Sequence, residues 1–282
     1  MDLIITNGFL TASFNALGAE LISLKTEKRE YIWNGNPDFW GKHSPILFPI
    51  VGALKDDTFF YQNKTYQLPR HGFAREKQFE VIEHKEDKIV FSLKNDAETL
   101  KIYPFCFELR IEYQLHQNML DVKYWVQNTD RDKMYFSIGG HPAFQLLENF
   151  ENHALEFETN SALHFSLLNQ NLLEHETAPL TLQDKKLPLS YELFEQDALV
   201  FCNQDIQAIS ITDQGKTILK VHFEQFPDLG LWTKSNAPFI CIEPWFGYAD
   251  VVSTNQNLTT KEGIQQLEAN QIFTAQYAIE IF

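Results

Sequence analysis

The chain has 282 residues, of which 44% are hydrophobic and 22% charged, so it can bury a sizeable core and disorder is not expected. Its formal net charge is −15. Proteins that bind nucleic acid neutralise the phosphates with an excess of lysine and arginine, which this chain lacks, so a nucleic-acid partner is not expected. The start of the chain lacks the features of a signal peptide, and no run approaches the ~20 apolar residues of a spanning helix. We therefore expect a cytoplasmic protein that binds no nucleic acid and no membrane.

Apolar and polar residues alternate along much of the chain, which indicates half-buried strands. The clearest case is 107–115, followed by a turn at 116–118 and a second alternating run at 120–126, and these predict an antiparallel hairpin. Shorter strands are expected at 19–24, 59–61, 65–67, 79–84, 89–93, 133–138, 155–158, 199–202, 208–212, 219–223 and 273–281. Helical signals occur only at 36–40, 96–102 and 191–195, and the polar segment 169–188 is expected to be a long connection.

Closely spaced strands with almost no crossover helices favour an all-β fold, a large antiparallel β-sandwich with few short helices. Because sandwiches of this length are commonly single domains, residues 1–282 are predicted to form one domain. Cys106, Cys202 and Cys241 form an odd, scattered set in apolar runs, and they are expected to be reduced and buried.

His141 stands out within the run Ser137-Ile138-Gly139-Gly140-His141-Pro142-Ala143-Phe144. Two preceding glycines would let the backbone approach a ligand, and the following proline restricts His141 to an extended conformation at the end of a strand. An imidazole titrates near neutral pH and suits proton transfer. The alternative is a turn whose histidine only packs.

Two other runs carry groups suited to binding or acid–base chemistry. Arg70, His71 and Arg75 lie within eight residues in Leu68-Pro69-Arg70-His71-Gly72-Phe73-Ala74-Arg75, and arginine offers fixed forks of donors to carboxylates, phosphates or paired hydroxyls. Glu243 follows the apolar residues 239–242, beside Trp245, where partial burial would raise its pKa and make it a better base. The alternatives are a solvated turn for the first run and a structural ion pair for the second.

Asp197 and Trp232 complete the candidate site. Asp197 would accept hydrogen bonds from sugar hydroxyls or cap a turn, and Trp232 and Trp245 would stack on a sugar face or pack in the core. No spacing typical of metal ligands, phosphate-binding loops or a nucleophile motif is present, so neither a metal nor a cofactor is predicted.

In order and spacing, four runs resemble the aldose 1-epimerase (galactose mutarotase-like) family, in its LacX-type branch. They are Pro45-Ile46-Leu47-Phe48-Pro49-Ile50-Val51-Gly52, the run from Arg70 to Arg75, Gly140-His141-Pro142-Ala143-Phe144 and Ile242-Glu243-Pro244-Trp245. The resemblance covers nearly the whole chain. It implies a β-supersandwich without a cofactor that binds a small-molecule sugar, an aldohexose or a phosphorylated relative, as a monomer or homodimer.

The resemblance also implies roles for individual residues. His141 is similar to the family's general acid and Glu243 to its general base, with His71 near the sugar ring oxygen and Asp197 binding hydroxyls. Galactose-specific members carry an arginine in an early glycine–arginine motif, which the comparable stretch Gly52-Ala53-Leu54-Lys55 lacks, so Arg70 or Arg75 would take its place. The implied reaction is anomer interconversion by acid–base opening and reclosure of the sugar ring.

Two other functions remain open from the sequence. A glycosidase would need two carboxylates on either side of the scissile bond, and Glu243 and Asp197 are candidates, but His141 would then have no role. A carbohydrate-binding or sensing protein built on the same scaffold would bind sugar without catalysis.

Overall fold

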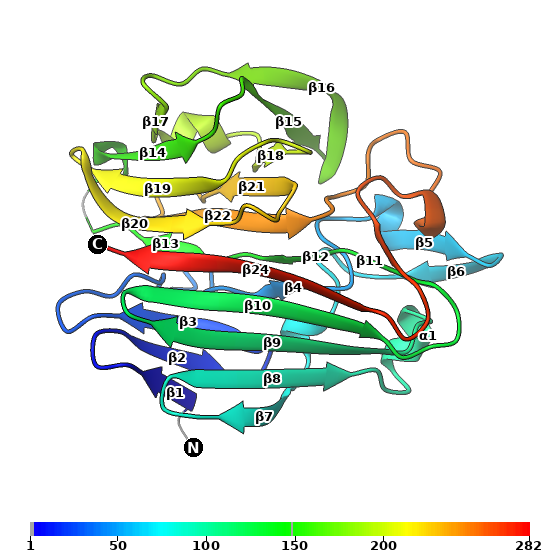
Figure 1. The fold of residues 1–282 in the computed structure, drawn as a ribbon. Coiled ribbons are helices and arrows are strands. Elements are labelled where there is room, and N and C mark those ends of the chain that lie inside the picture. Colours follow the sequence, from blue (N-terminus) through cyan, green and yellow to red (C-terminus); the bar gives the residue numbers. More distant parts are fainter. Residues whose placement is uncertain (1–2, 148) are drawn as a thin grey trace.

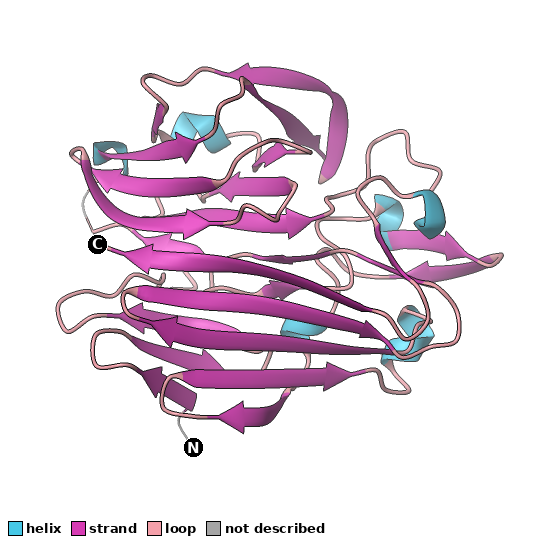
Figure 2. Ribbon diagram, viewed as in Figure 1, coloured by secondary structure: helices cyan, strands magenta, loops and turns pink. Residues whose placement is uncertain are grey.

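The computed structural model describes residues 3–147 and 149–282, most of them in antiparallel strands, as predicted (Figures 1 and 2). A nine-stranded sheet forms the front layer in Figure 1. In spatial order it contains β17 (Lys186–Pro188), β14 (His153–Glu158), β19 (Ala208–Asp213), β20 (Lys216–His222), β24 (Ile272–Ile281), β10 (Met119–Asn128), β9 (Phe107–His116), β8 (Lys88–Lys94) and β7 (Glu80–His84).

An eight-stranded sheet carries the residues of the candidate site. It contains β16 (Leu172–Leu180), β15 (Leu163–Asn169), β18 (Leu199–Phe201), β21 (Asp228–Trp232), β22 (Phe239–Phe246), β12 (Ile138–Gly140) and β4 (Ile46–Leu47) in that order, and β13 (Ala143–Gln145) pairs with β22. Smaller sheets are formed by β1 (Leu3–Thr6), β2 (Thr11–Asn15) and β3 (Glu20–Lys25), by β5 (Thr58–Tyr61) and β6 (Lys64–Gln67), and by β11 (Met134–Phe136) and β23 (Gln265–Leu267).

Helices are confined to single turns. They are α1 (Thr99–Ile102) and the 3-10 helices η1 (Lys55–Asp57), η2 (Ala74–Glu76), η3 (Phe150–Asn152), η4 (Tyr191–Phe194) and η5 (Leu258–Thr260). Within residues 3–147 and 149–282, no helix is both long and apolar enough to span a membrane.

The predicted hairpin is confirmed as β9 and β10, and its register shows why alternation specifies the fold. Leu109 pairs with Val126 and Ile111 with Tyr124, and all four side chains are buried. Their neighbours point to the opposite face, because successive strand residues alternate sides. The buried face joins a core that spans the layers.

The core lies between the sheets and is rich in aromatic rings. Phe157 of β14 meets Phe201 of β18 with centroids 6.3 Å apart, which joins the two large sheets. Phe14 of β2 meets Tyr113 of β9 at 4.5 Å, which packs the three-stranded sheet against the nine-stranded one. Burial of such rings removes large apolar areas from water and stabilises the layers.

Two expectations from the sequence are wrong in detail, whereas the turn expected at 36–40 is present, with the backbone N–H groups of Phe39 and Trp40 donating to the Asn36 carbonyl. Segment 169–188 is no simple connection, because it contains β16 and β17. Of the cysteines, only Cys241 is fully buried, whereas Cys106 and Cys202 are half-buried; all three are free.

Candidate active site

The site lies on the face of the eight-stranded sheet that points away from the core. Along β22, Ile240 and Ile242 belong to the main core, whereas Cys241, Glu243 and Trp245 alternate with them and point to the opposite face. The sequence predicted only that Glu243 follows the apolar run 239–242. The strand continues to Phe246, so Glu243 is held inside a ladder, opposite Gly230 of β21.

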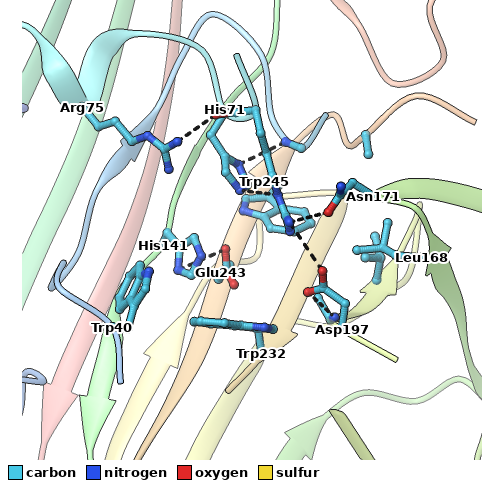
Figure 3. A pocket seen from close by; sticks show the side chains of 15 residues that line it. Trp40, His71, Arg75, His141, Leu168, Asn171, Asp197, Trp232, Glu243 and Trp245 are labelled. Carbon is cyan, nitrogen blue, oxygen red and sulfur yellow. Dashed lines mark hydrogen bonds and ion pairs between the residues drawn. The ribbon is translucent and has the colours of Figure 1, made fainter. Parts of the chain in front are cut away.

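Above this face is a cavity of about 310 Å³, near the lower end of the range for ligand pockets, ~300–1,000 Å³. All eight residues singled out from the sequence line it: Arg70, His71, Arg75, His141, Asp197, Trp232, Glu243 and Trp245. The structure therefore brings together groups from five separate stretches of chain (Figure 3). The size suits a single small polar ligand.

His141 and Glu243 form a buried pair beside the cavity. His141 Nδ1 lies 3.4 Å from Glu243 Oε2, and neither atom has a hydrogen-bond partner among the described residues. The His141 backbone N–H donates to the carbonyl of Pro45, which fixes the loop after β12. Trp40 stacks on the imidazole with centroids 4.7 Å apart, and Trp232 meets it edge-on at 5.6 Å (Figure 3).

Burial moves the protonation of both groups toward their neutral forms. It lowers the pKa of His141 to about 3, an effect reinforced by the positive charges of Arg70 and Arg75. It also raises the pKa of Glu243 well above its usual range; Arg70 opposes this shift and Asp197 adds to it. The site therefore favours the uncharged forms of both groups, a neutral imidazole and a protonated carboxyl, more than water does.

The glycines before His141 make room for side chains of the protein and not for a ligand, contrary to the expectation from the sequence. A Cβ on Gly139 would lie 2.3 Å from the Trp245 ring, and one on Gly140 would lie 2.7 Å from the Tyr124 hydroxyl. The Trp245 indole donates to the Gly140 carbonyl at 3.2 Å and is only 5% exposed. Trp245 is thus largely part of the cavity wall.

His71 and Asp197 are both held in the left-handed backbone region, at φ values of 68° and 73°. Such conformations are uncommon for residues other than glycine and mark positions that the surrounding structure enforces. The Asp197 carboxylate accepts from the backbone N–H of Ala198 and lies 3.4 Å from Arg70 Nη1. Burial lowers the pKa of His71 well below its ordinary value, with further contributions from His141, Arg70 and Arg75.

Two cavity residues that carry polar or stacking groups were missed from the sequence. Trp40 comes from a loop and covers His141, and Asn171, in the turn between β15 and β16, accepts a hydrogen bond from Arg70 at 2.8 Å. Neither belongs to a local motif, so only tertiary structure brings them to the site. His141, Cys241 and Glu243 also place potential metal-ligating atoms within 4.8 Å of one another.

Fold and site together define a class of protein: an antiparallel β-sandwich with a small cavity lined by polar and aromatic side chains and a buried histidine–glutamate pair in its wall. The aldose 1-epimerase family model matches residues 1–279. Protein LacX (chromosomal) of Lactococcus lactis subsp. lactis is 34% identical over 95% of both chains. The chain belongs to the aldose 1-epimerase family, as the motifs indicated.

Solved structures agree with this assignment. A galactose mutarotase related enzyme from Lactobacillus acidophilus is 34% identical and superposes with a TM-score of 0.95, covering 100% of this chain and 97% of its own. A galactose mutarotase-like protein from Lactobacillus casei is 29% identical with a TM-score of 0.94, covering all of both chains. The galactose mutarotase-like β-sandwich is thereby confirmed as the fold.

Proposed function

We propose that the protein is a mutarotase that interconverts the α and β anomers of an aldohexose or a related sugar, with His141 and Glu243 as its acid–base pair. The observation that carries this proposal is the 3.4 Å approach of two otherwise unpartnered titratable atoms at a sugar-sized cavity. Anomer exchange removes a proton from the C1 hydroxyl and delivers one to the ring oxygen. Both oxygens are bonded to C1, so the acid and the base must lie close together.

The proton count of the pair suits this reaction. A neutral imidazole with a protonated carboxyl holds the same number of protons as an imidazolium with a carboxylate. Moving one proton from Glu243 to His141 therefore creates the base and the acid without exchange with solvent. An ionised Glu243 at this distance also favours the charged imidazole. Sugar hydroxyls that enter the cavity would stabilise the charged form by hydrogen bonding.

The reaction then proceeds through proton transfers alone. The Glu243 carboxylate takes the C1 hydroxyl proton while His141 protonates the ring oxygen, and the C1–O5 bond breaks to give the open-chain aldehyde. Rotation about C1–C2 presents the other face of the aldehyde. Ring closure returns the proton to His141 and Glu243 delivers one to the new C1 hydroxyl. Asp197, Arg70 and Trp232 line the same cavity. In this proposal the first two hold the sugar hydroxyls, and Trp232 contacts an apolar ring face.

The test is the rate of anomer exchange, followed by polarimetry or NMR, with α-D-glucose, α-D-galactose and glucose 6-phosphate. We expect wild type to accelerate exchange and Glu243→Gln to lose about 10²–10⁴-fold in kcat, the usual contribution of a general acid–base group. The control is Lys101→Met, which alters an exposed lysine paired with Glu98. Sugar binding by the wild type without acceleration would instead indicate a binding or sensing protein.

A further inference from the structure

The imidazole of His71 faces an N–H donor on each side. The Gly52 backbone N–H points at Nδ1 over 3.1 Å, and the Arg70 Nε–H points at Nε2 over 3.2 Å. A neutral imidazole has one acceptor nitrogen and one N–H, and an imidazolium has no acceptor at all. His71 therefore satisfies only one of these two donors, and the other meets an N–H group.

Of the two donors, the Gly52 backbone N–H is the one that needs an acceptor on the His71 ring. Residues 52 and 71 are bonded twice, because the His71 backbone N–H also donates to the Gly52 carbonyl at 2.8 Å. Gly52 is buried at φ +73°, and its Cβ position lies 2.6 Å from Ala249, so its backbone has no room to turn. A buried N–H without a partner costs about 1–3 kcal/mol. Nδ1 is consequently the acceptor, and Nε2 carries the proton.

Arg70 is the donor that is free to move. Its side chain is 39% exposed, and its Nη1 is bonded to Asn171 at 2.8 Å and lies 3.4 Å from the Asp197 carboxylate. A long side chain at the cavity mouth reaches water at small cost, unlike a buried peptide group. In its present position its Nε–H meets the Nε2–H of His71, an arrangement that an acceptor atom between them would relieve.

We propose that His71 is fixed as its Nε2–H tautomer, and that an acceptor oxygen of the substrate binds to this N–H by displacing the Arg70 guanidinium from the ring. The identity of the oxygen as a sugar oxygen rests on the proposed function, whereas the tautomer does not. A separation of 3.2 Å between the two nitrogens leaves no space for an oxygen, so binding requires Arg70 to shift. A ring oxygen, a hydroxyl and a phosphate oxygen share the chemistry that this position selects.

The tautomer is tested on the unliganded full-length protein by long-range ¹H–¹⁵N NMR of ¹⁵N-histidine-labelled samples, with His71 assigned by the loss of its signals in His71→Gln. We expect a protonated Nε2 and an unprotonated Nδ1 for His71 at neutral pH. The reverse pattern, or a signal averaged between the two forms, would overturn the assignment. This readout is independent of any enzymatic activity.

The displacement is tested by adding glucose, galactose, glucose 6-phosphate and inorganic phosphate to a sample labelled with ¹⁵N in both histidine and arginine. We expect the His71 Hε2 signal to move downfield on gaining an oxygen acceptor, and the Arg70 Nε–H signal to move with it. A shift with the sugars alone identifies a sugar oxygen, and one with phosphate alone identifies an anion oxygen. If none of the four ligands moves Hε2, the displacement is wrong, even where anomer exchange is catalysed.

Two substitutions separate the role of His71 in substrate binding from a purely structural one. His71→Asn places an acceptor near the Nδ1 position, toward Gly52, whereas His71→Gln places an amide N–H near the Nε2 position, toward the cavity. We expect kcat/KM of His71→Gln to be about 3–10-fold higher than that of His71→Asn, a ratio that corresponds to one hydrogen bond to the substrate. We also expect His71→Asn to be the more stable of the two proteins in urea titrations, because it keeps an acceptor for the Gly52 N–H. A structural role alone would make the more stable variant the more active one.

Discussion

Burial shifts the pKa values of two side chains of the cavity in opposite directions, each toward its uncharged form. His141 lies against the Trp40 ring, and His141 and Glu243 are both buried, so burial opposes each charge separately. In the proposed reaction the two groups share one transferable proton, and their apparent pKa values then belong to the pair. Catalysis would depend on keeping that proton, which links pH dependence directly to the geometry.

The pH profile of kcat/KM should therefore differ from that of a free histidine. We expect kcat/KM to stay constant as pH falls from about 7 to about 5, because the pKa of His141 is lowered to about 3; an ordinary histidine gains its proton across this interval. Activity should fall as pH rises above the raised pKa of Glu243, since the pair then loses its shared proton. Rates corrected for spontaneous exchange give the profile, and a decline centred near the ordinary histidine pKa of about 6.5 would contradict the prediction.

At the scale of elements, Asp228 joins the ends of three strands beneath the site. It begins β21, and its carboxylate accepts from the backbone N–H of Asn203, after β18, and from that of Gly247, after β22. The side chain is 3% exposed, and burial raises its pKa to about 6 against the opposing effect of these two hydrogen bonds. The strands that carry Trp232 and Glu243 thus share one buried anchor.

The raised pKa of Asp228 makes a prediction about stability. Because the folded state binds this proton more tightly than the unfolded chain does, the contribution of Asp228 to stability is present at low pH and is lost as pH rises through about 6. We expect the difference in unfolding free energy between wild type and Asp228→Asn to change by about 2–3 kcal/mol in that direction between about pH 4 and about pH 7. Urea titrations at both pH values measure it.

The control for this experiment is Asp205→Asn, which changes an exposed aspartate close to Asn203. Its stability difference from wild type should be small in both titrations, because substitutions of exposed side chains usually change stability little. Parallel behaviour of the two variants would show that Asp228 does not titrate as its burial indicates.

Across the whole molecule, a buried ion pair connects segments that are far apart in the sequence. Lys261 Nζ lies 3.1 Å from the Asp250 carboxylate and donates to the Tyr248 carbonyl at 2.6 Å, with both charged side chains nearly inaccessible. Asp250 also accepts from the Lys55 backbone N–H and donates its own N–H to the Ala53 carbonyl. The pair therefore supports the turn that begins at Gly52 and holds His71.

Loss of one partner should be costly. Lys261→Met leaves the Asp250 carboxylate buried without its cation, and we expect the free energy of unfolding to fall by about 3–5 kcal/mol in urea titrations. Lys101→Met breaks an exposed pair with Glu98 and should cost no more than about 1 kcal/mol. Equal losses of unfolding free energy in the two variants would mean that the buried pair contributes no more to stability than the exposed pair.

The limits of sequence reasoning follow from the same physics. Alternation locates β9, β10 and β24 because one face of each is buried. In β16 only Leu173 is buried and the middle of the strand is the polar run 174–177, so its sequence looks like a connection. The motifs locate His141 and Glu243. Trp40 reaches the cavity through tertiary contacts only, and the steric need for Gly139 is set by Trp245, a residue distant in the chain.

The alternation along β22 divides its residues into two sets, one that packs in the core and one on the side of the cavity. Ile240 and Ile242 pack in the main core, while Glu243 and Trp245 line the cavity and Cys241 is buried on the same side of the strand as these two. A substitution at Glu243 or Trp245 therefore changes the cavity, whereas a substitution at Ile240 or Ile242 changes the packing of the sandwich. An insertion or deletion of one residue would exchange the two sets and destroy both at once. During evolution this strand can therefore accept single-residue substitutions more readily than an insertion or a deletion.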